Sequence, residues 1–173
     1  MGQYYKVVIL ADTKYKTEIV RKWMLPNSCA KLMEHAYLDN PFMRSIEAML
    51  GRDGVLYMTR IIWVGDYAEN EENLESNLYY LVENMSDRYY RLQQQQQQPQ
   101  HQYIVNHTKK LYVDKNKCTS VHPLPLLVSE GNGCGGGDYF GNDQDLCGTW
   151  ARDVISMEQD IPEEYTELTV SFS

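Results

Sequence analysis

The hydrophobic pattern of the first half of the chain alternates between segments typical of strands and one segment typical of a helix. Residues 3 to 11 (QYYKVVILA) and 55 to 64 (VLYMTRIIWV) are rich in β-branched and aromatic side chains, which predicts two strands. Between them, Asn40 and Pro41 suit the cap and first position of a helix, and Gly51 suits its end. The apolar positions inside that helix recur at helical spacing, at Phe42, Ile46, Met49 and Leu50.

A second main helix is predicted over residues 69 to 92, because apolar residues form one stripe and acidic residues fill the first turns. The Gln-rich segment at about residues 93 to 101 then interrupts the pattern, and its composition cannot build a core. We therefore expect a mobile insert there, with a polyglutamine interaction segment as the alternative.

The second half of the chain is rich in strand signals, which recur at residues 102 to 113, 121 to 128, 150 to 157 and 168 to 172. The first of these reads as a strand or hairpin, and Pro123 and Pro125 restrict the second to an edge strand or extended segment. A length of 173 residues suits one domain. The chain therefore predicts a single α+β domain with a mixed or mainly antiparallel sheet and two main helices packed on one side.

Charge and cysteine usage narrow the class of protein. The chain has 16 Lys and Arg against 24 Asp and Glu, a net charge of −8, and its cations never cluster densely, which argues against general nucleic-acid binding. It shows neither a signal-peptide pattern nor an apolar run long enough to span a membrane. We therefore expect a soluble, intracellular protein without a membrane partner, whose four cysteines are free thiols.

The most distinctive segment is the glycine-rich stretch GNGCGGGDYFGN at residues 131 to 142. Glycine permits positive φ and lets a ligand approach backbone N–H groups closely. The stretch lacks the Lys-Ser/Thr ending of a phosphate loop and the following helix of a dinucleotide fingerprint. Three interpretations stay open: a flexible connector, a cradle for an anion or nucleotide, and a turn that aims Asp138.

The first functional hypothesis is a small binding module that holds an anionic small molecule or nucleotide at this stretch. Guanidinium and ammonium groups would neutralise the ligand, while side chains and glycine backbone would orient it. The residues expected to do this are Lys31, Arg60, Asn132, Gly133, Gly135, Gly136, Gly137, Asp138 and Arg152. For Arg152, an internal ion pair with Asp153 is the alternative.

The second hypothesis is a hydrolase that uses Asp66, Asp138 and Asp153 with a divalent metal ion. Gly65-Asp66-Tyr67 and Gly137-Asp138-Tyr139 are followed by acidic, amide and leucine residues at identical offsets, which suggests an internal repeat. His35 is a further acid or base candidate, with a structural histidine as the alternative. No fixed metal-ligand spacing occurs, so the sequence names no residue as a metal ligand outside this hypothesis and leaves the cofactor open. A structural or interaction protein without a small-molecule site is the third hypothesis.

Several segments together resemble an uncharacterised family of small proteins of bacteria, phages and large DNA viruses. They are MGQYYK, KLMEHAYLDN, IIWVGDYAENE and the run YIVNHTKK…HPLPLL…EGNGCGGGDYFGN…GTWARDVIS. The resemblance covers most of the chain outside the Gln-rich insert, and it departs from the family at Cys134, where the family carries Arg. It implies a single coherent domain and no known activity. A viral setting would place the protein in a host cytoplasm or a virion. The resemblance leaves open whether it binds a protein partner or forms a homo-oligomer.

Overall fold

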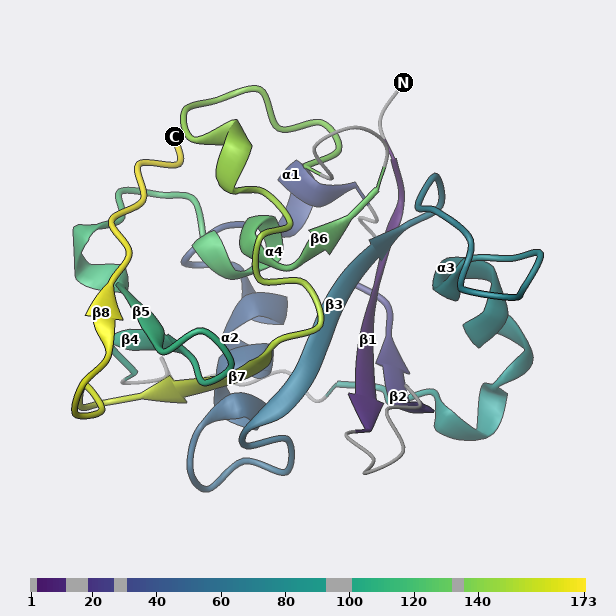
Figure 1. Cartoon of the computed structure of the whole chain (residues 1–173), viewed down its shortest axis with the longest axis horizontal. Coiled ribbons are helices and arrows are strands. Elements are labelled where there is room, and N and C mark those ends of the chain that lie inside the picture. The colour runs from purple at the N-terminus through teal and green to yellow at the C-terminus, as the bar shows by residue number, and fades with distance from the viewer. Residues whose placement is uncertain (1–2, 12–18, 27–30, 93–100, 132–135) are drawn as a thin grey trace.

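The structure is a computed structural model that describes residues 3–11, 19–26, 31–92, 101–131 and 136–173. One eight-stranded sheet organises the chain (Figure 1), in the order β2-β1-β3-β7-β4-β5-β8, with β6 paired to β3. Two of the pairings, β3 with β6 and β5 with β8, are parallel, and the others are antiparallel. The strands are β1 (Tyr5–Ala11), β2 (Ile19–Met24), β3 (Thr59–Gly65), β4 (Tyr103–Asn106), β5 (Leu111–Asp114), β6 (Ser129–Glu130), β7 (Val154–Glu158) and β8 (Thr166–Glu167). The predicted α+β class, with one mixed and mostly antiparallel sheet, is confirmed.

The helices are few and short. They are α1 (Leu32–His35), α2 (Pro41–Leu50), α3 (Leu78–Leu81) and α4 (Pro123–Leu127), with single 3₁₀ turns η1 (Val82–Asn84), η2 (Ser86–Arg88), η3 (Lys115–Lys117) and η4 (Gln144–Leu146). Helix α2 begins where the sequence predicts, because the Asn40 side chain accepts hydrogen bonds from the amides of Phe42 and Met43. It ends at Gly51, whose amide still donates to the Glu47 carbonyl.

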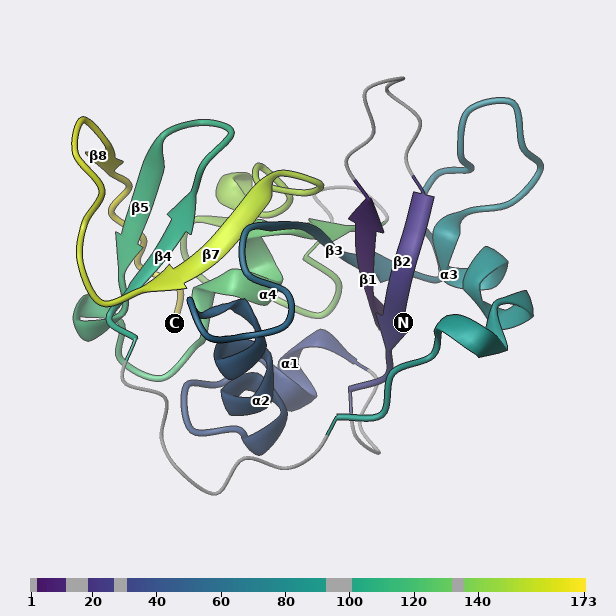
Figure 2. The same cartoon turned by 90° about the horizontal axis from the view of Figure 1, so that it is seen from below.

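Strands β1 and β3 are buried on both faces, which explains their nearly continuous apolar sequences. Odd-numbered residues such as Val7 and Ile61 belong to the core beneath α1, α2 and α4. Even-numbered residues such as Val8 and Ile62 belong to a second, smaller core under α3 and η1. Figures 1 and 2 show α1 and α2 side by side and α3 apart from them, near β1 and β2. Helices α2 and α3 therefore cover opposite faces of the sheet.

The long helix predicted for residues 69 to 92 is wrong. Residues 69 to 77 form a loop in which Asn73 takes a left-handed φ of 62°. Asn77 then caps α3 by accepting the Tyr80 amide, and its amide nitrogen donates to the carbonyls of Asp66 and Ala68. The left-handed backbone at Asn73 and the Asn77 side chain, which competes for backbone groups, stop the acidic segment from joining the helix.

The strands predicted at residues 121 to 128 and 168 to 172 are also wrong, and the strand predicted from residue 150 begins only at Val154. Residues 123 to 127 form helix α4, because Pro123 fits its first position and the His122 ring accepts the Leu124 amide. Residues 150 to 153 form a turn that precedes β7, with Arg152 in the left-handed region at φ 67°. The last strand is the short β8, and it precedes residues 168 to 172.

Of the remaining predictions, one is confirmed and one lies mostly outside the described residues. Residues 102 to 113 do form a hairpin, β4 with β5. Most of the Gln-rich insert, residues 93 to 100, lies outside the described residues. Among the described residues, no helix is long and apolar enough to cross a membrane.

Candidate functional site

The described glycines of the glycine-rich stretch face the protein itself. A β-carbon on Gly137 would lie 2.7 Å from the Tyr5 hydroxyl, and one on Gly131 would lie 2.3 Å from Oε1 of Gln3. A β-carbon on Gly65, at the end of β3, would also lie close to Oε1 of Gln3, at 2.7 Å. A β-carbon on Gly136 would lie 3.0 Å from Sγ of Cys147. Gly65, Gly131 and Gly137 therefore leave room for Gln3 and Tyr5, and Gly136 leaves room for Cys147, so the predicted ligand role of Gly136 and Gly137 has no support in their geometry.

Asp66 and Asp138 both hold backbone amides beside Tyr5. Oδ1 of Asp138 accepts from the Met33 amide at 3.0 Å, and Oδ1 of Asp66 accepts from the Tyr4 amide at 3.1 Å. Burial, followed by the nearby charges of Asp138, Cys147 and Asp66, raises the pKa of Tyr5 well above its ordinary value. Both carboxylates therefore bind backbone amides close to the same buried tyrosine, which is a structural role.

The two Gly-Asp-Tyr segments differ in conformation. Gly137 has a left-handed φ of 61°, whereas Gly65 is the last residue of a strand. Tyr139 is buried and Tyr67 is exposed. The suggested internal repeat is not visible in the local backbone.

Asp153 and His35 are also bound to neighbouring side chains. Oδ2 of Asp153 accepts from Nδ2 of Asn106 at 2.8 Å and from Nζ of Lys109. Nε2 of His35 accepts from the Trp63 indole at 3.0 Å inside the main core. Across the described part of the chain, no three His, Cys, Asp or Glu side chains gather in a way that could hold a metal ion. The proposed trio of aspartates is therefore not assembled.

Arg152 is held by two glutamates and not by Asp153. Its Nε and Nη2 donate to Glu130 at 2.6 and 3.0 Å, and Nη1 donates to Glu71 at 3.1 Å, with a second bond from Nη2. Burial alone would lower the pKa of Arg152, but the hydrogen bonds to Glu71 and Glu130 raise it above its ordinary value. Of the other residues predicted for the cradle, Lys31 lies at the start of α1, and Asn132, Gly133 and Gly135 lie outside the described residues.

Arg60 lines a different hollow, which we call the arginine hollow. It has a volume of about 580 Å³ and is lined by Leu10, Arg21, Met58, Thr59, Arg60, His107, Thr108 and Val154. Nη1 of Arg60 donates to the Arg152 carbonyl at 2.8 Å, which anchors the guanidinium at the junction of β3 and β7. The described lining residues include two arginines and no Asp or Glu.

A β-bulge places Arg21 in this hollow. Ile9 pairs with Lys22, but the next residue, Leu10, pairs with Val20, so Arg21 is the extra residue in β2. Bulges of this kind bend a strand and re-aim its side chains. Arg21 and Arg60 therefore line one space although they come from different strands of the sheet.

His107 forms a wall of the hollow with both ring nitrogens in use. The Ser156 hydroxyl donates to Glu158 at 2.9 Å, so it must accept from Nε2 of His107, 2.7 Å away. Nδ1 then accepts from the Tyr165 hydroxyl at 3.0 Å. Burial lowers the pKa of His107, which favours this neutral ring. In this series of hydrogen bonds, the Glu158 carboxylate contacts Ser156 and not His107, and Ser156 is fully buried. The three residues are therefore not arranged as a catalytic triad.

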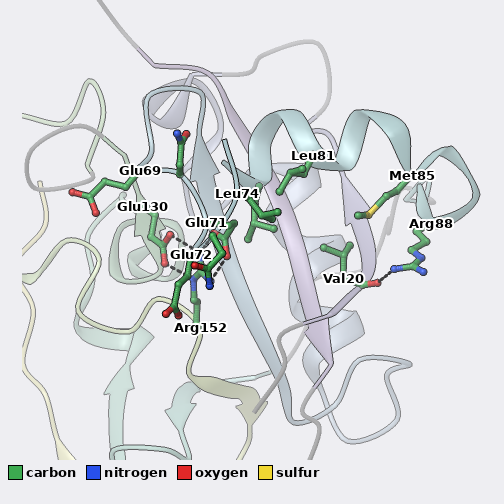
Figure 3. A pocket seen from close by; sticks show the side chains of 13 residues that line it. Val20, Glu69, Glu71, Glu72, Leu74, Leu81, Met85, Arg88, Glu130 and Arg152 are labelled. Carbon is green, nitrogen blue, oxygen red and sulfur yellow. Dashed lines mark hydrogen bonds and ion pairs between the residues drawn. The ribbon is translucent and has the colours of Figure 1, made fainter. Parts of the chain in front are cut away.

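A larger open groove lies beside α3, and we call it the acidic groove. Figure 3 shows the side chains that line it. Its volume is about 920 Å³. It is lined by Val20, Glu69, Asn70, Glu71, Glu72, Asn73, Leu74, Leu78, Leu81, Met85, Arg88, Glu130 and Arg152. Glutamates gather at one end, and leucine, methionine and valine side chains form the other.

Sequence reasoning missed both the bulged Arg21 and the acidic groove. The available signal for Arg21 was the pair Arg21-Lys22 inside an apolar stretch, where two consecutive charges break the alternation of a strand. The available signal for the groove was the acidic stretch after residue 69, which the helix prediction absorbed. Of the described lining residues, only Val20, Glu130 and Arg152 join from distant parts of the chain.

Comparison with known proteins finds no matching family model, and no curated protein or solved structure matches the chain. The resemblance described from the sequence motifs therefore stays a prediction.

Proposed function

We propose that the protein is a small binding module for an anionic small molecule, and that it holds the anion in the arginine hollow. One observation carries the proposal: a β-bulge and a paired strand bring Arg21 and Arg60 to the same hollow. None of the described residues that line it is acidic, in a chain whose net charge is −8. A local positive site of this kind concentrates anions against the field of the rest of the protein.

The chemistry of the lining suits a phosphate or carboxylate attached to an organic group. Guanidinium groups present planar forks of N–H donors that match both anions. The exposed Thr108 hydroxyl accepts from the Val154 amide at 3.0 Å, so its own hydrogen can point to a ligand. Leu10 and Val154 add apolar surface, and a volume of about 580 Å³ lies within the range of small-molecule sites.

The proposal is binding and not acid–base catalysis. The two nitrogens of His107 are committed to Ser156 and Tyr165, so the ring offers a ligand its carbon atoms. A guanidinium group has N–H donors and no acceptor, so Arg60 and Arg21 can serve here only as hydrogen-bond donors.

Isothermal titration calorimetry with inorganic phosphate, adenosine monophosphate and citrate tests the proposal. We expect at least one of these anions to bind, and Arg21→Gln to weaken it by about 10- to 100-fold, since a hydrogen bond to a charged group contributes about 1.5–3 kcal/mol. Arg91→Gln, at an exposed arginine that does not line the hollow, is the matched control. Heat signals absent for every anion, or equal losses in both variants, would show that the hollow is not the site.

A further inference from the structure

We propose that the acidic groove docks a basic, amphipathic peptide segment of a partner protein. This site is separate from the arginine hollow and does not depend on the function proposed for it. The groove has two chemically distinct ends joined by one open surface, as Figure 3 shows. Its occupant must therefore carry positive charge and apolar side chains together.

The acidic end has an excess of negative charge. Arg152 is bonded to Glu71 and Glu130, and Glu69 and Glu72 line the groove beside them. Four carboxylates against one guanidinium leave three negative charges in excess at this end. Glu69 and Glu72 line the groove, are exposed, and have no ion pair with any described residue. A Lys or Arg of a partner would meet both attraction and vacant hydrogen-bond acceptors here.

The apolar end exposes side chains that a monomer would otherwise bury. Leu74 is 52% exposed, and Leu81 and Met85 are half-buried over the second core. Methionine and leucine adapt readily to different apolar partners. Arg88 closes this end and donates from Nη1 to the Val20 carbonyl at 2.6 Å. A peptide with apolar residues on one face would cover this wall, as in other grooves that bind amphipathic segments.

The groove is held in shape before any partner arrives. Arg152 has a left-handed φ of 67° and connects the 69–77 loop, through Glu71, to β6, through Glu130. The Glu71 amide also donates to the Ser76 carbonyl at 3.0 Å within that loop. Ordering the loop in advance lowers the entropy cost of binding. A strained residue that is held by several contacts is common at functional sites.

Fluorescence polarisation with a labelled synthetic peptide tests the inference on the full chain. The probe has about 14 residues, roughly 20 Å as a helix, with Leu at every third or fourth position and Lys or Gln elsewhere. One control peptide carries Glu in place of Lys. The other has the same composition with the leucines scattered around all faces. We expect the amphipathic basic peptide to bind and both control peptides to bind at least about tenfold more weakly.

Matched variants locate the binding surface. The double variant Glu69→Gln/Glu72→Gln and the single variant Leu74→Gln should each weaken the probe by about tenfold. Glu75→Gln, in the same loop but outside the lining, and Leu25→Gln, an exposed leucine elsewhere, should change it by less than about twofold. All five substituted positions are on the surface or in an open loop, so circular dichroism should show an unchanged fold.

Four results would overturn the inference. The scattered-leucine peptide could bind as tightly as the probe, which would show charge attraction alone. Glu75→Gln could weaken the probe as much as the groove variants, which would place binding elsewhere on the loop. Sedimentation velocity could show a dimer that Leu74→Gln dissociates, and the groove would then belong to a second copy of the chain. Absence of any peptide binding would overturn it as well.

Discussion

Gly137 lies directly against the hydroxyl of Tyr5, where a β-carbon on the glycine would be 2.7 Å from the oxygen. The glycine also has a left-handed φ of 61°, which side chains rarely adopt. Two independent constraints, backbone conformation and space, therefore require glycine at this position. The described end of the glycine-rich stretch thus serves the packing of a buried tyrosine.

Gly137→Ala is expected to lower the free energy of unfolding by about 2–4 kcal/mol. Roughly 1 kcal/mol comes from the left-handed backbone, and about 1–3 kcal/mol comes from overpacking against Tyr5. Urea unfolding measures the change. In a double-mutant cycle, Tyr5→Phe should recover part of the loss by removing the oxygen. Strictly additive effects of the two substitutions would contradict the contact.

The buried cluster of Glu47, Lys115 and His122 should be sensitive to loss of its carboxylate. Oε1 of Glu47 accepts from Lys115 Nζ and from His122 Nε2, each at 2.6 Å, and all three side chains are almost fully buried. Glu47→Gln leaves the Lys115 ammonium without its counter-charge, so we expect a loss of about 3–5 kcal/mol in urea unfolding. The matched control is Glu167→Gln, which breaks the more exposed pair with Lys117 and should cost less than about 1 kcal/mol. Similar losses in the two variants would argue against the cluster.

The stability of the protein should decrease as the pH falls below about 6.5, the ordinary pKa of histidine. Burial lowers the pKa of His122, His101 and His107 in the folded state, so the unfolded chain binds protons first. The stabilisation is therefore complete above the unfolded pKa and is lost as the pH decreases towards the folded one. For the fully buried His122 alone, the slope is about 1.4 kcal/mol per pH unit.

Urea unfolding measured at four chosen pH values, about 8, 7, 6 and 5, checks this dependence. His122→Asn keeps an acceptor for the Leu124 amide. Below about pH 6.5 it should reduce the dependence of the free energy of unfolding on pH by an amount equivalent to at most one bound proton. A slope of the opposite sign, or an equal slope in the variant, would contradict the assignment.

Arg152→Lys should loosen the 69–77 loop while retaining the positive charge. A lysine cannot form the forked hydrogen bonds that Arg152 makes with Glu71 and Glu130. We expect faster amide exchange at Glu71 and Leu74, whose backbone amides are bonded within that loop. Amide exchange in β1, which lies between β2 and β3 in the sheet, should stay slow in the same sample. Unchanged exchange in the loop would mean that its own hydrogen bonds suffice.

The secondary-structure elements that are set by residues adjacent in the sequence could be predicted from the sequence. The cap at Asn40, the end at Gly51 and the apolar runs of β1 and β3 are local signals, because each describes what adjacent backbone can satisfy. The same local reasoning failed at residues 69 to 92. There, the apolar stripe predicted a helix, but the Asn77 side chain binds backbone groups and Asn73 takes a left-handed φ, and together they divide the segment.

The candidate sites depended on contacts between distant residues, which a single sequence does not display. Arg21 joins Arg60 only because a bulge shifts the register of two strands. Arg152 meets Glu71 and Glu130 across the sheet, although the sequence offers Asp153 as its nearest partner.

By itself, the sequence determined the α+β class, the start and end of α2, and the buried strands β1 and β3, because hydrophobic periodicity and capping act over a few residues. Only the tertiary structure decided that the glycines pack on Tyr5 and that the aspartates bind separate partners. It also decided that positive and negative charges lie in two different hollows. The physical reason is that these features depend on strand register and chain crossing, which bring together groups far apart along the chain.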